Sequence, residues 1–238
     1  MRTINDINVK IFADGADKVT MLEMYKNPLI KGLTTNPTLM RRAGITDYRL
    51  FCKDILKEIN SKPISFEVFS DDFVEIERQA NEIAGWGDNV YVKIPITNTK
   101  GEVCYPLVSK LCAANVKVNV TAIMTIEQVE NVVNVLNPDV PSYVSVFAGR
   151  IADTGRDPLP MMQEAVACLK KSPKAELIWA SPREFLNIVQ AAEIGCQIIT
   201  VTSDIIKKVS LLDYDLADYS LDTVKMFYLD AIAAKFTL

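Results

Sequence analysis

Short apolar runs alternate with longer amphipathic stretches along the whole chain. Eight runs are rich in valine and isoleucine, which predicts the strands of a parallel sheet covered by helices. They are Val9–Asp14, Ile30–Thr35, Ile64–Phe69, Asn89–Ile94, Lys117–Thr121, Ser142–Phe147, Ala175–Ala180 and Gln197–Val201. Apolar residues three and four positions apart predict helices over Asp71–Trp86, Thr125–Leu136, Leu159–Lys170 and Pro182–Ile194.

Eight strands, each followed by a helical stretch, predict a (β/α)8 TIM barrel of the α/β class. A doubly wound open sheet is the alternative, but no G-x-G-x-x-G sequence opens the first helix. The segment Leu221–Phe236 lies beyond the eighth unit and predicts an additional C-terminal helix. We see no linker-like stretch, so residues 1–238 are expected to form one domain. That helix then packs either on its own barrel or on a neighbouring subunit.

Composition narrows the possible environment and partners. The 238 residues are 49% apolar, and 26 basic against 30 acidic residues give a net charge of −4, which offers no electrostatic basis for binding nucleic acid or an anionic membrane. The five cysteines form no C-x-x-C pair. No apolar stretch has the length of a signal or transmembrane segment. We therefore expect a cytoplasmic protein with reduced thiols.

The chain contains no histidine. This excludes Ser-His-Asp and Cys-His catalysis, histidine-ligated zinc and a histidine general base. Proton transfers in any reaction must then use carboxylates, lysine, tyrosine or water.

The predicted strands carry polar residues toward their C-terminal ends, where the active site of a barrel lies. Lys93 is the most informative, because it stands within the apolar run Val90–Pro95. A buried lysine loses solvation and becomes a better nucleophile. The alternative is a structural ion pair between Lys93 and Glu67 on the adjacent strand.

Other charged residues lie at the same end of the predicted barrel. Asp14 ends the first strand and Glu67 lies in the third; two carboxylates near one lysine suit repeated acid and base steps. A strand-end carboxylate can instead cap the next helix, which is the alternative role for Asp14. Arg150 and Arg183 follow strands six and seven, where barrels commonly bind phosphate.

Five segments, in this order, resemble the short-chain branch of the transaldolase family, and the resemblance extends roughly from Val9 to Phe236. They are Lys31–Thr38 with T-T-N-P, Val90–Pro95 with V-K-I-P, Asn119–Thr121 with N-x-T, Ser145–Ile151 with S-x-F-x-G-R-I, and Trp179–Arg183 with A-S-P-R.

The resemblance implies transfer of a dihydroxyacetone unit between a ketose phosphate and an aldose phosphate, a reaction of carbohydrate metabolism and the pentose phosphate pathway. Lys93 would form a Schiff base, Asp14 would move the proton of the substrate hydroxyl, and Glu67 with Thr121 would hold the catalytic water. The substrate-binding residues implied are Thr35, Asn36, Asn119, Ser145, Phe147, Arg150, Ser181 and Arg183. No metal or cofactor is implied, because the protonated imine accepts the electrons.

Two other functions are open at this stage. A fructose-6-phosphate aldolase of the same branch would release free dihydroxyacetone, but such aldolases are expected to have glutamine at position 67 and tyrosine at position 147. A non-catalytic sugar-phosphate-binding barrel is disfavoured by the retention of Lys93, Asp14 and Glu67.

This chain departs from the family pattern twice. Gly15 follows Asp14 where threonine or serine is usual, and Pro182 replaces an aromatic residue. The resemblance also suggests a homo-oligomer, pentamer or decamer, assembled through the terminal helix.

Overall fold

A computed structural model describes residues 3–237 as a closed barrel of parallel strands. Neighbouring strands follow chain order, and β8 pairs with β1 to close the ring. This confirms the predicted (β/α)8 barrel over the alternative open sheet. The strands are β1 (Lys10–Asp14), β2 (Ile30–Thr34), β3 (Ile64–Glu67), β4 (Val90–Pro95), β5 (Val118–Ile123), β6 (Ser142–Val146), β7 (Ala175–Trp179) and β8 (Ile198–Val201).

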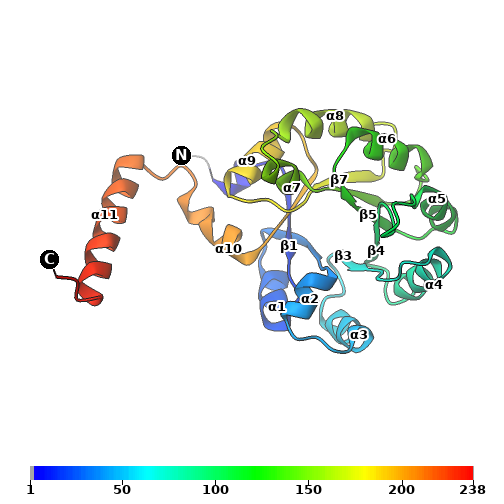
Figure 1. The fold of residues 1–238 in the computed structure, drawn as a ribbon, viewed down its shortest axis with the longest axis horizontal. Coiled ribbons are helices and arrows are strands. Elements are labelled where there is room, and N and C mark those ends of the chain that lie inside the picture. Colours follow the sequence, from blue (N-terminus) through cyan, green and yellow to red (C-terminus); the bar gives the residue numbers. More distant parts are fainter. Residues whose placement is uncertain (1–2, 238) are drawn as a thin grey trace.

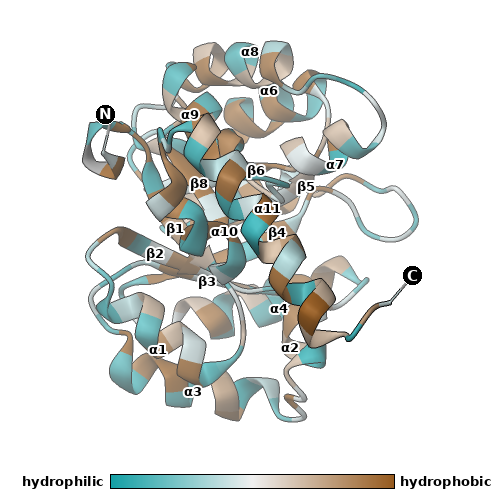
Figure 2. Ribbon diagram, turned by 90° about the vertical axis from the view of Figure 1, so that its left-hand side faces the viewer, coloured by the Kyte–Doolittle hydropathy of each residue, from teal (hydrophilic) through white to brown (hydrophobic). Residues whose placement is uncertain are grey.

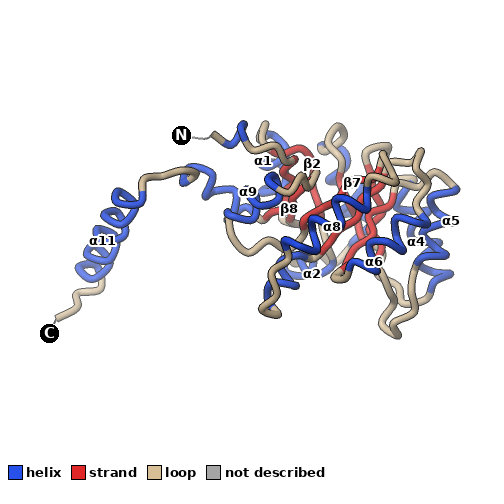
Figure 3. Tube along the Cα trace, turned by 90° about the horizontal axis from the view of Figure 1, so that it is seen from above, coloured by secondary structure: helices blue, strands red, loops and turns tan. Residues whose placement is uncertain are grey.

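Helices surround these strands, which lie at the centre of the molecule (Figures 1 and 3). Two helices each connect β2 to β3 and β6 to β7. Among residues 3–237, no helix combines the length and apolar character needed to cross a bilayer. The helices are α1 (Lys18–Lys26), α2 (Pro37–Arg42), α3 (Tyr48–Glu58), α4 (Phe73–Ala84), α5 (Tyr105–Ala113), α6 (Ile126–Val135), α7 (Ala148–Asp153), α8 (Leu159–Leu169), α9 (Leu186–Glu193), α10 (Ser203–Ile206) and α11 (Leu216–Ala233), with 3-10 turns at Ile4–Asp6 and Lys207–Leu211.

Most predicted helix boundaries agree with the structure, but the start of α9 was predicted wrongly. Pro182 does not begin the helix, because Ser181 adopts a left-handed backbone conformation with φ 57°. The chain then makes a loop in which the Asn187 side chain accepts hydrogen bonds from the Arg183 and Glu184 N–H groups. The helix therefore begins at Leu186.

An apolar layer fills the barrel below the C-terminal ends of the strands. Five side chains of this layer face inward: Phe12, Tyr91, Tyr143, Ile178 and Ile198. The Tyr91 and Tyr143 rings stack with centroids 4.0 Å apart. Because side chains alternate along a strand, the residue two positions further on faces the same interior, one layer higher. This layer is the floor on which the polar residues stand.

The C-terminal helix α11 extends away from the barrel (Figures 1 and 3). It begins five residues earlier than predicted, because the Asp215 carboxylate caps it by accepting from the Ala217 and Asp218 N–H groups. None of its described residues is buried, and Phe227 and Tyr228 are 62% and 67% exposed. Apolar residues are spread along it (Figure 2). The short α10 is the helix that directly follows β8.

Candidate functional site

A cavity of about 510 Å³ opens at the C-terminal ends of the strands. Polar groups from most strands of the barrel converge on it. Its lining comprises Asp14, Thr34, Asn36, Pro37, Thr38, Leu39, Arg42, Glu67, Lys93, Thr121, Ala122, Ser145, Phe147, Arg150, Ala180, Ser181, Arg183 and Thr200.

Lys93 lies at the base of this cavity with only 6% of its surface exposed. Its Nζ is 3.1 Å from Glu67 Oε2 and donates a hydrogen bond to the Thr35 carbonyl at 3.0 Å. The pairing of Glu67 with Lys93 across β3 and β4 fixes this contact. The ion pair suggested by the sequence is therefore present, and it lies within the cavity rather than in the apolar core. A carboxylate in this position can also take a proton from the amine.

A backbone irregularity in β5 accompanies Thr121, which lines the cavity. The β5–β6 register shifts between Val120 and Ile123, and Ala122 has φ 62°. The Thr121 hydroxyl is buried and has no hydrogen-bond partner among the described residues. Since buried hydroxyl groups are normally paired, this oxygen is available to a ligand in the cavity.

Asp14 stands at the end of β1 within a chain of hydroxyl groups. Thr34 Oγ1 donates to Asp14 Oδ1 at 2.8 Å and lies 2.5 Å from Thr200 Oγ1. Asp14 caps no helix, since Asp17 is the residue that caps α1. Burial raises the pKa of the Asp14 carboxyl, and this outweighs the opposing effects of the Lys93 charge and the Thr34 hydrogen bond. A carboxyl of this kind is suited to both give and accept a proton.

The raised pKa of Asp14 predicts a particular pH dependence of stability. The folded state binds the Asp14 proton more tightly than the unfolded state does. The contribution of this proton to the free energy of unfolding is therefore complete below the pKa of Asp14 in the unfolded chain, and is lost as pH rises through its pKa in the folded protein. Asp14→Asn should remove this decrease of the unfolding free energy with pH, which is at most about 1.4 kcal/mol per pH unit. Urea unfolding of both proteins between pH 4 and 8 measures it. A pH-independent difference between them would contradict the assignment.

Basic residues stand at the mouth of the cavity on the β6 and β7 side. The Arg150 guanidinium lies 5.6 Å from the centre of the Phe147 ring. Arg183 pairs with Asp153 through two hydrogen bonds, which lowers the pKa of that carboxyl. Gly149 allows α7 to approach the Ser181 backbone, because a Cβ there would lie 1.5 Å from the Ser181 oxygen. Together these groups form a place for an anionic substituent such as phosphate.

Two of the expected substrate-binding residues do not line the cavity. The Thr35 hydroxyl donates to the Ser65 carbonyl instead, while the Thr35 carbonyl accepts from Lys93. Asn119 is fully buried, donates to Ser65 Oγ and accepts from Ser145 Oγ at 2.7 Å. The structure brings every other predicted site residue to the cavity wall, including Asn36, whose side chain also caps α2.

Sequence reasoning missed Thr34, Thr200 and Arg42, which the structure places in the lining. Thr200 is a polar residue in the apolar strand Ile198–Val201, the same signal that identified Lys93. For Thr34, the two-residue alternation counted from Gly32 would have favoured it over Thr35 as the inward-facing threonine. Arg42 ends a helix and has no comparable signal.

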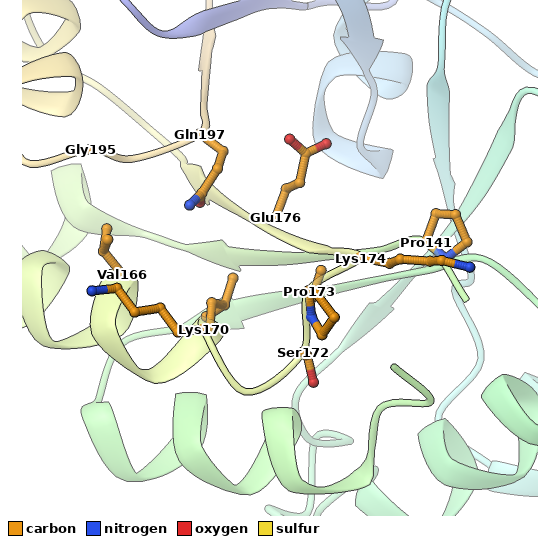
Figure 4. A pocket seen from close by; sticks show the side chains of 11 residues that line it. Pro141, Val166, Lys170, Ser172, Pro173, Lys174, Glu176, Gly195 and Gln197 are labelled. Carbon is orange, nitrogen blue, oxygen red and sulfur yellow. The ribbon is translucent and has the colours of Figure 1, made fainter. Parts of the chain in front are cut away.

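A second hollow of about 620 Å³ lies at the other end of the barrel (Figure 4). It is lined by residues at the N-terminal ends of β6 to β8, among them Pro141, Glu176 and Gln197. Its lysines, Lys170 and Lys174, are exposed. That end of a barrel usually contributes to stability, and among the described residues this hollow's lining contains no buried lysine or cysteine.

Within residues 3–237, no group of three or more cysteine, aspartate or glutamate side chains is arranged to hold a metal ion. The cavity contains the buried Lys93 amine and the carboxylates of Asp14 and Glu67. An amine beside proton-transfer groups is suited to covalent catalysis on a carbonyl substrate.

Comparison with known proteins gives matches over almost the whole chain. The sequence model of one family, described as Transaldolase/Fructose-6-phosphate aldolase, matches residues 11–235. A protein of Dehalococcoides mccartyi named "Probable transaldolase" is 32% identical over 211 residues, covering 88% of this chain and 93% of the relative. A protein of Nitrosopumilus maritimus with the same name is 30% identical over 219 residues, covering 90% and 92%.

Solved structures are similar in fold only. A putative dihydrodipicolinate synthase family protein from Coccidioides immitis superposes with a TM-score of 0.61 at 12% identity, covering 97% of this chain and 80% of that one. A putative phosphonomutase from Burkholderia cenocepacia gives 0.55 at 10% identity, covering 92% and 93%.

Proposed function

The chain belongs to the transaldolase/fructose-6-phosphate aldolase family, and from this premise we propose that it transfers a dihydroxyacetone unit from a ketose phosphate to an aldose phosphate. The observation that carries the proposal is the buried Lys93 amine, held 3.1 Å from the Glu67 carboxylate inside a cavity. Lysine is rarely buried, and a buried lysine that opens into a cavity beside proton-transfer groups is a candidate for catalysis.

The reaction begins with attack of the Lys93 amine on the ketose carbonyl. Glu67 takes one proton from the Lys93 ammonium so that the amine can attack, and a second N–H proton passes to the former carbonyl oxygen to give a carbinolamine. Glu67 then returns its proton to that hydroxyl, which leaves as water. Thr121, with its free buried hydroxyl, holds this water beside Glu67. The product is a protonated imine, which draws electrons from the neighbouring carbon–carbon bond and so needs no metal.

Cleavage requires a base for the substrate hydroxyl at the far carbon of the breaking bond. Asp14 takes that proton, the bond breaks, an aldose phosphate leaves, and the electron pair moves onto the imine to form an enamine. Because burial raises the pKa of Asp14, its carboxyl can hold the proton until an acceptor aldehyde arrives. The reverse sequence then joins the three-carbon unit to the acceptor.

The phosphate group is bound at the β6 and β7 side of the mouth. Arg150 and Arg183 provide charge, and Ser181 provides a hydroxyl, at the place where barrels commonly bind phosphate. Arg183 is oriented by Asp153. Pro182 has no aromatic ring, so this end of the cavity differs in shape from the family pattern. A panel of sugar phosphates tests which sugar the protein accepts.

Transfer is favoured over simple aldol cleavage by Glu67 and Phe147. Free dihydroxyacetone is released when the enamine is protonated and hydrolysed, and a tyrosine hydroxyl at position 147 would assist that step. Phe147 lines the cavity and offers no proton donor. We therefore expect little dihydroxyacetone from fructose 6-phosphate alone and much faster turnover when erythrose 4-phosphate is added.

Phe147→Tyr should raise the ratio of release to transfer by roughly tenfold or more, since a well-positioned general acid contributes about 100-fold or more. The measurement is product partitioning with and without the acceptor, in both proteins. Tyr143→Phe, which alters a ring in the floor below the cavity, is the control. Rapid acceptor-independent release by the unmodified protein would favour the aldolase.

The exposed helix α11 supports a homo-oligomer as part of this proposal. Its apolar side chains, including Leu221, Val224 and Phe227, make no buried contact with their own barrel. Exposure of this extent indicates a protein–protein contact. Truncation after Asp218 should lower the number of subunits per particle, obtained by light scattering. Lys225→Glu leaves the apolar residues intact and should keep that number unchanged. An unchanged number of subunits after truncation would argue against assembly through α11.

A further inference from the structure

Tyr48, the first residue of α3, contacts the backbone of a catalytic residue without lining the cavity. Its hydroxyl donates to the Glu67 carbonyl at 2.7 Å and accepts from the Glu67 N–H at 2.8 Å. One side chain thus satisfies both backbone groups of the residue that faces Lys93.

These two bonds stand where the β2–β3 ladder would otherwise continue. Leu33 N donates to the Pro63 carbonyl and Thr35 N donates to the Ser65 carbonyl. In a continuing parallel ladder, the next bond would run from the Glu67 N–H to the Thr35 carbonyl. Instead the Glu67 N–H donates to Tyr48, and the Thr35 carbonyl accepts from Lys93 Nζ at 3.0 Å.

The Tyr48 ring is held in place by its surroundings. It packs edge-on to Phe69 with centroids 5.1 Å apart and lies 6.4 Å from the Trp86 ring. The Asp47 carboxylate caps α3 by accepting from the Leu50 N–H, so the helix start is fixed as well. Burial raises the pKa of the Tyr48 hydroxyl, which keeps its proton available for donation to Glu67.

We propose that Tyr48 is a positioning residue for Lys93. Its hydroxyl replaces the last rung of the β2–β3 ladder, orients the Glu67 strand end, and leaves the Thr35 carbonyl free to hold the amine. The inference rests on the proposed imine chemistry and adds a residue that touches neither substrate nor cavity. Without the hydroxyl, the Glu67 N–H can bond to Thr35 and compete with Lys93 for the same carbonyl.

The test uses Tyr48→Phe, which keeps the ring and removes the two bonds. Imine formation is followed by borohydride trapping of fructose 6-phosphate at timed intervals over a range of sugar concentrations. We expect the maximal trapping rate to fall by roughly 10- to 100-fold, as small displacements of catalytic groups do. The half-saturating concentration should stay within about twofold, because Arg150 and Arg183 still bind the phosphate.

Tyr25→Phe is the matched control, because the Tyr25 hydroxyl also bonds a neighbour, Ser61, away from the cavity. Its trapping rate should equal that of the unmodified protein. Unfolding midpoints in urea, measured for both variants, separate a loss of chemistry from a loss of folding.

The outcomes are distinct. Trapping by Tyr48→Phe at the unmodified rate, with or without a lower unfolding midpoint, overturns the role of Tyr48 and leaves the imine mechanism in place. A fall in rate matched by Tyr25→Phe also overturns it. Absence of trapping in the unmodified protein overturns the imine mechanism and the role of Tyr48 together.

Discussion

Replacing Lys93 with methionine should lower kcat by about ten-thousandfold or more, the loss typical of removing a covalent nucleophile. The amine is buried within the cavity and held by Glu67 and the Thr35 carbonyl, so no neighbouring amine can take its place. Lys93 is the only lysine among the described residues that line the cavity. Steady-state transfer between fructose 6-phosphate and erythrose 4-phosphate measures the effect.

Lys62→Met is the matched control. Lys62 is also partly buried, but it donates to the backbone carbonyl of Asn27 and does not line the cavity. This variant should retain nearly full activity.

The structural alternative for Lys93 makes a different prediction. If the pair with Glu67 only stabilised the fold, Lys93→Met would cost about 3–5 kcal/mol of unfolding free energy, because the Glu67 charge would be left unpaired. The double variant Lys93→Met with Glu67→Gln should recover much of that stability. Recovery of activity in the double variant would exclude a covalent role for Lys93.

Gly149→Ala should destabilise the protein by about 3 kcal/mol and lower kcat/KM for phosphorylated substrates by about 100-fold. A Cβ at this position would lie 1.5 Å from the Ser181 backbone oxygen, so either α7 or the loop after β7 must move. That loop carries Ser181 and Arg183, the groups proposed to bind phosphate. Urea unfolding and kinetics with sugar phosphates give the two quantities.

Gly85→Ala is the control for this substitution. The nearest atom to an added Cβ there is 3.5 Å away, which is an ordinary contact, and the residue has an ordinary φ of −77°. It should stabilise the protein by about 0.5 kcal/mol through the unfolded state. A stability loss in Gly149→Ala no larger than the change in Gly85→Ala would contradict the close approach of α7.

The barrel could be predicted because its strands are short apolar runs, whereas its helices are longer stretches with apolar residues three and four positions apart. Lys93 and Glu67 could be recognised for a related reason: a charged residue inside an apolar strand contradicts its neighbours and so indicates a special role. Both side chains do face the cavity. The same reasoning would have identified Thr200.

Other features depend on contacts between segments that are far apart in the sequence. Thr35 follows the end of β2, and its hydroxyl faces Ser65, thirty residues later in the chain. The role of Tyr48 likewise depends on where β2 ends relative to β3. A period of apolar residues gives the face of a strand but not its register with a neighbour, which is why these contacts could not be predicted.

The start of α9 shows the local limit of such prediction. Ser181-Pro182 is a common beginning for a helix, yet the left-handed backbone of Ser181 brings its carbonyl against Gly149 on α7. Packing between β7 and α7 therefore outweighs the local preference of the sequence.

Peptide mapping after borohydride trapping tests the central claim most directly. The protein is incubated with fructose 6-phosphate, reduced, digested and analysed by mass spectrometry. A covalent catalyst of the proposed kind should carry a reduced three-carbon unit on Lys93, and Lys93→Met should carry none. An adduct on a different lysine, or full transfer activity in Lys93→Met, would contradict the mechanism.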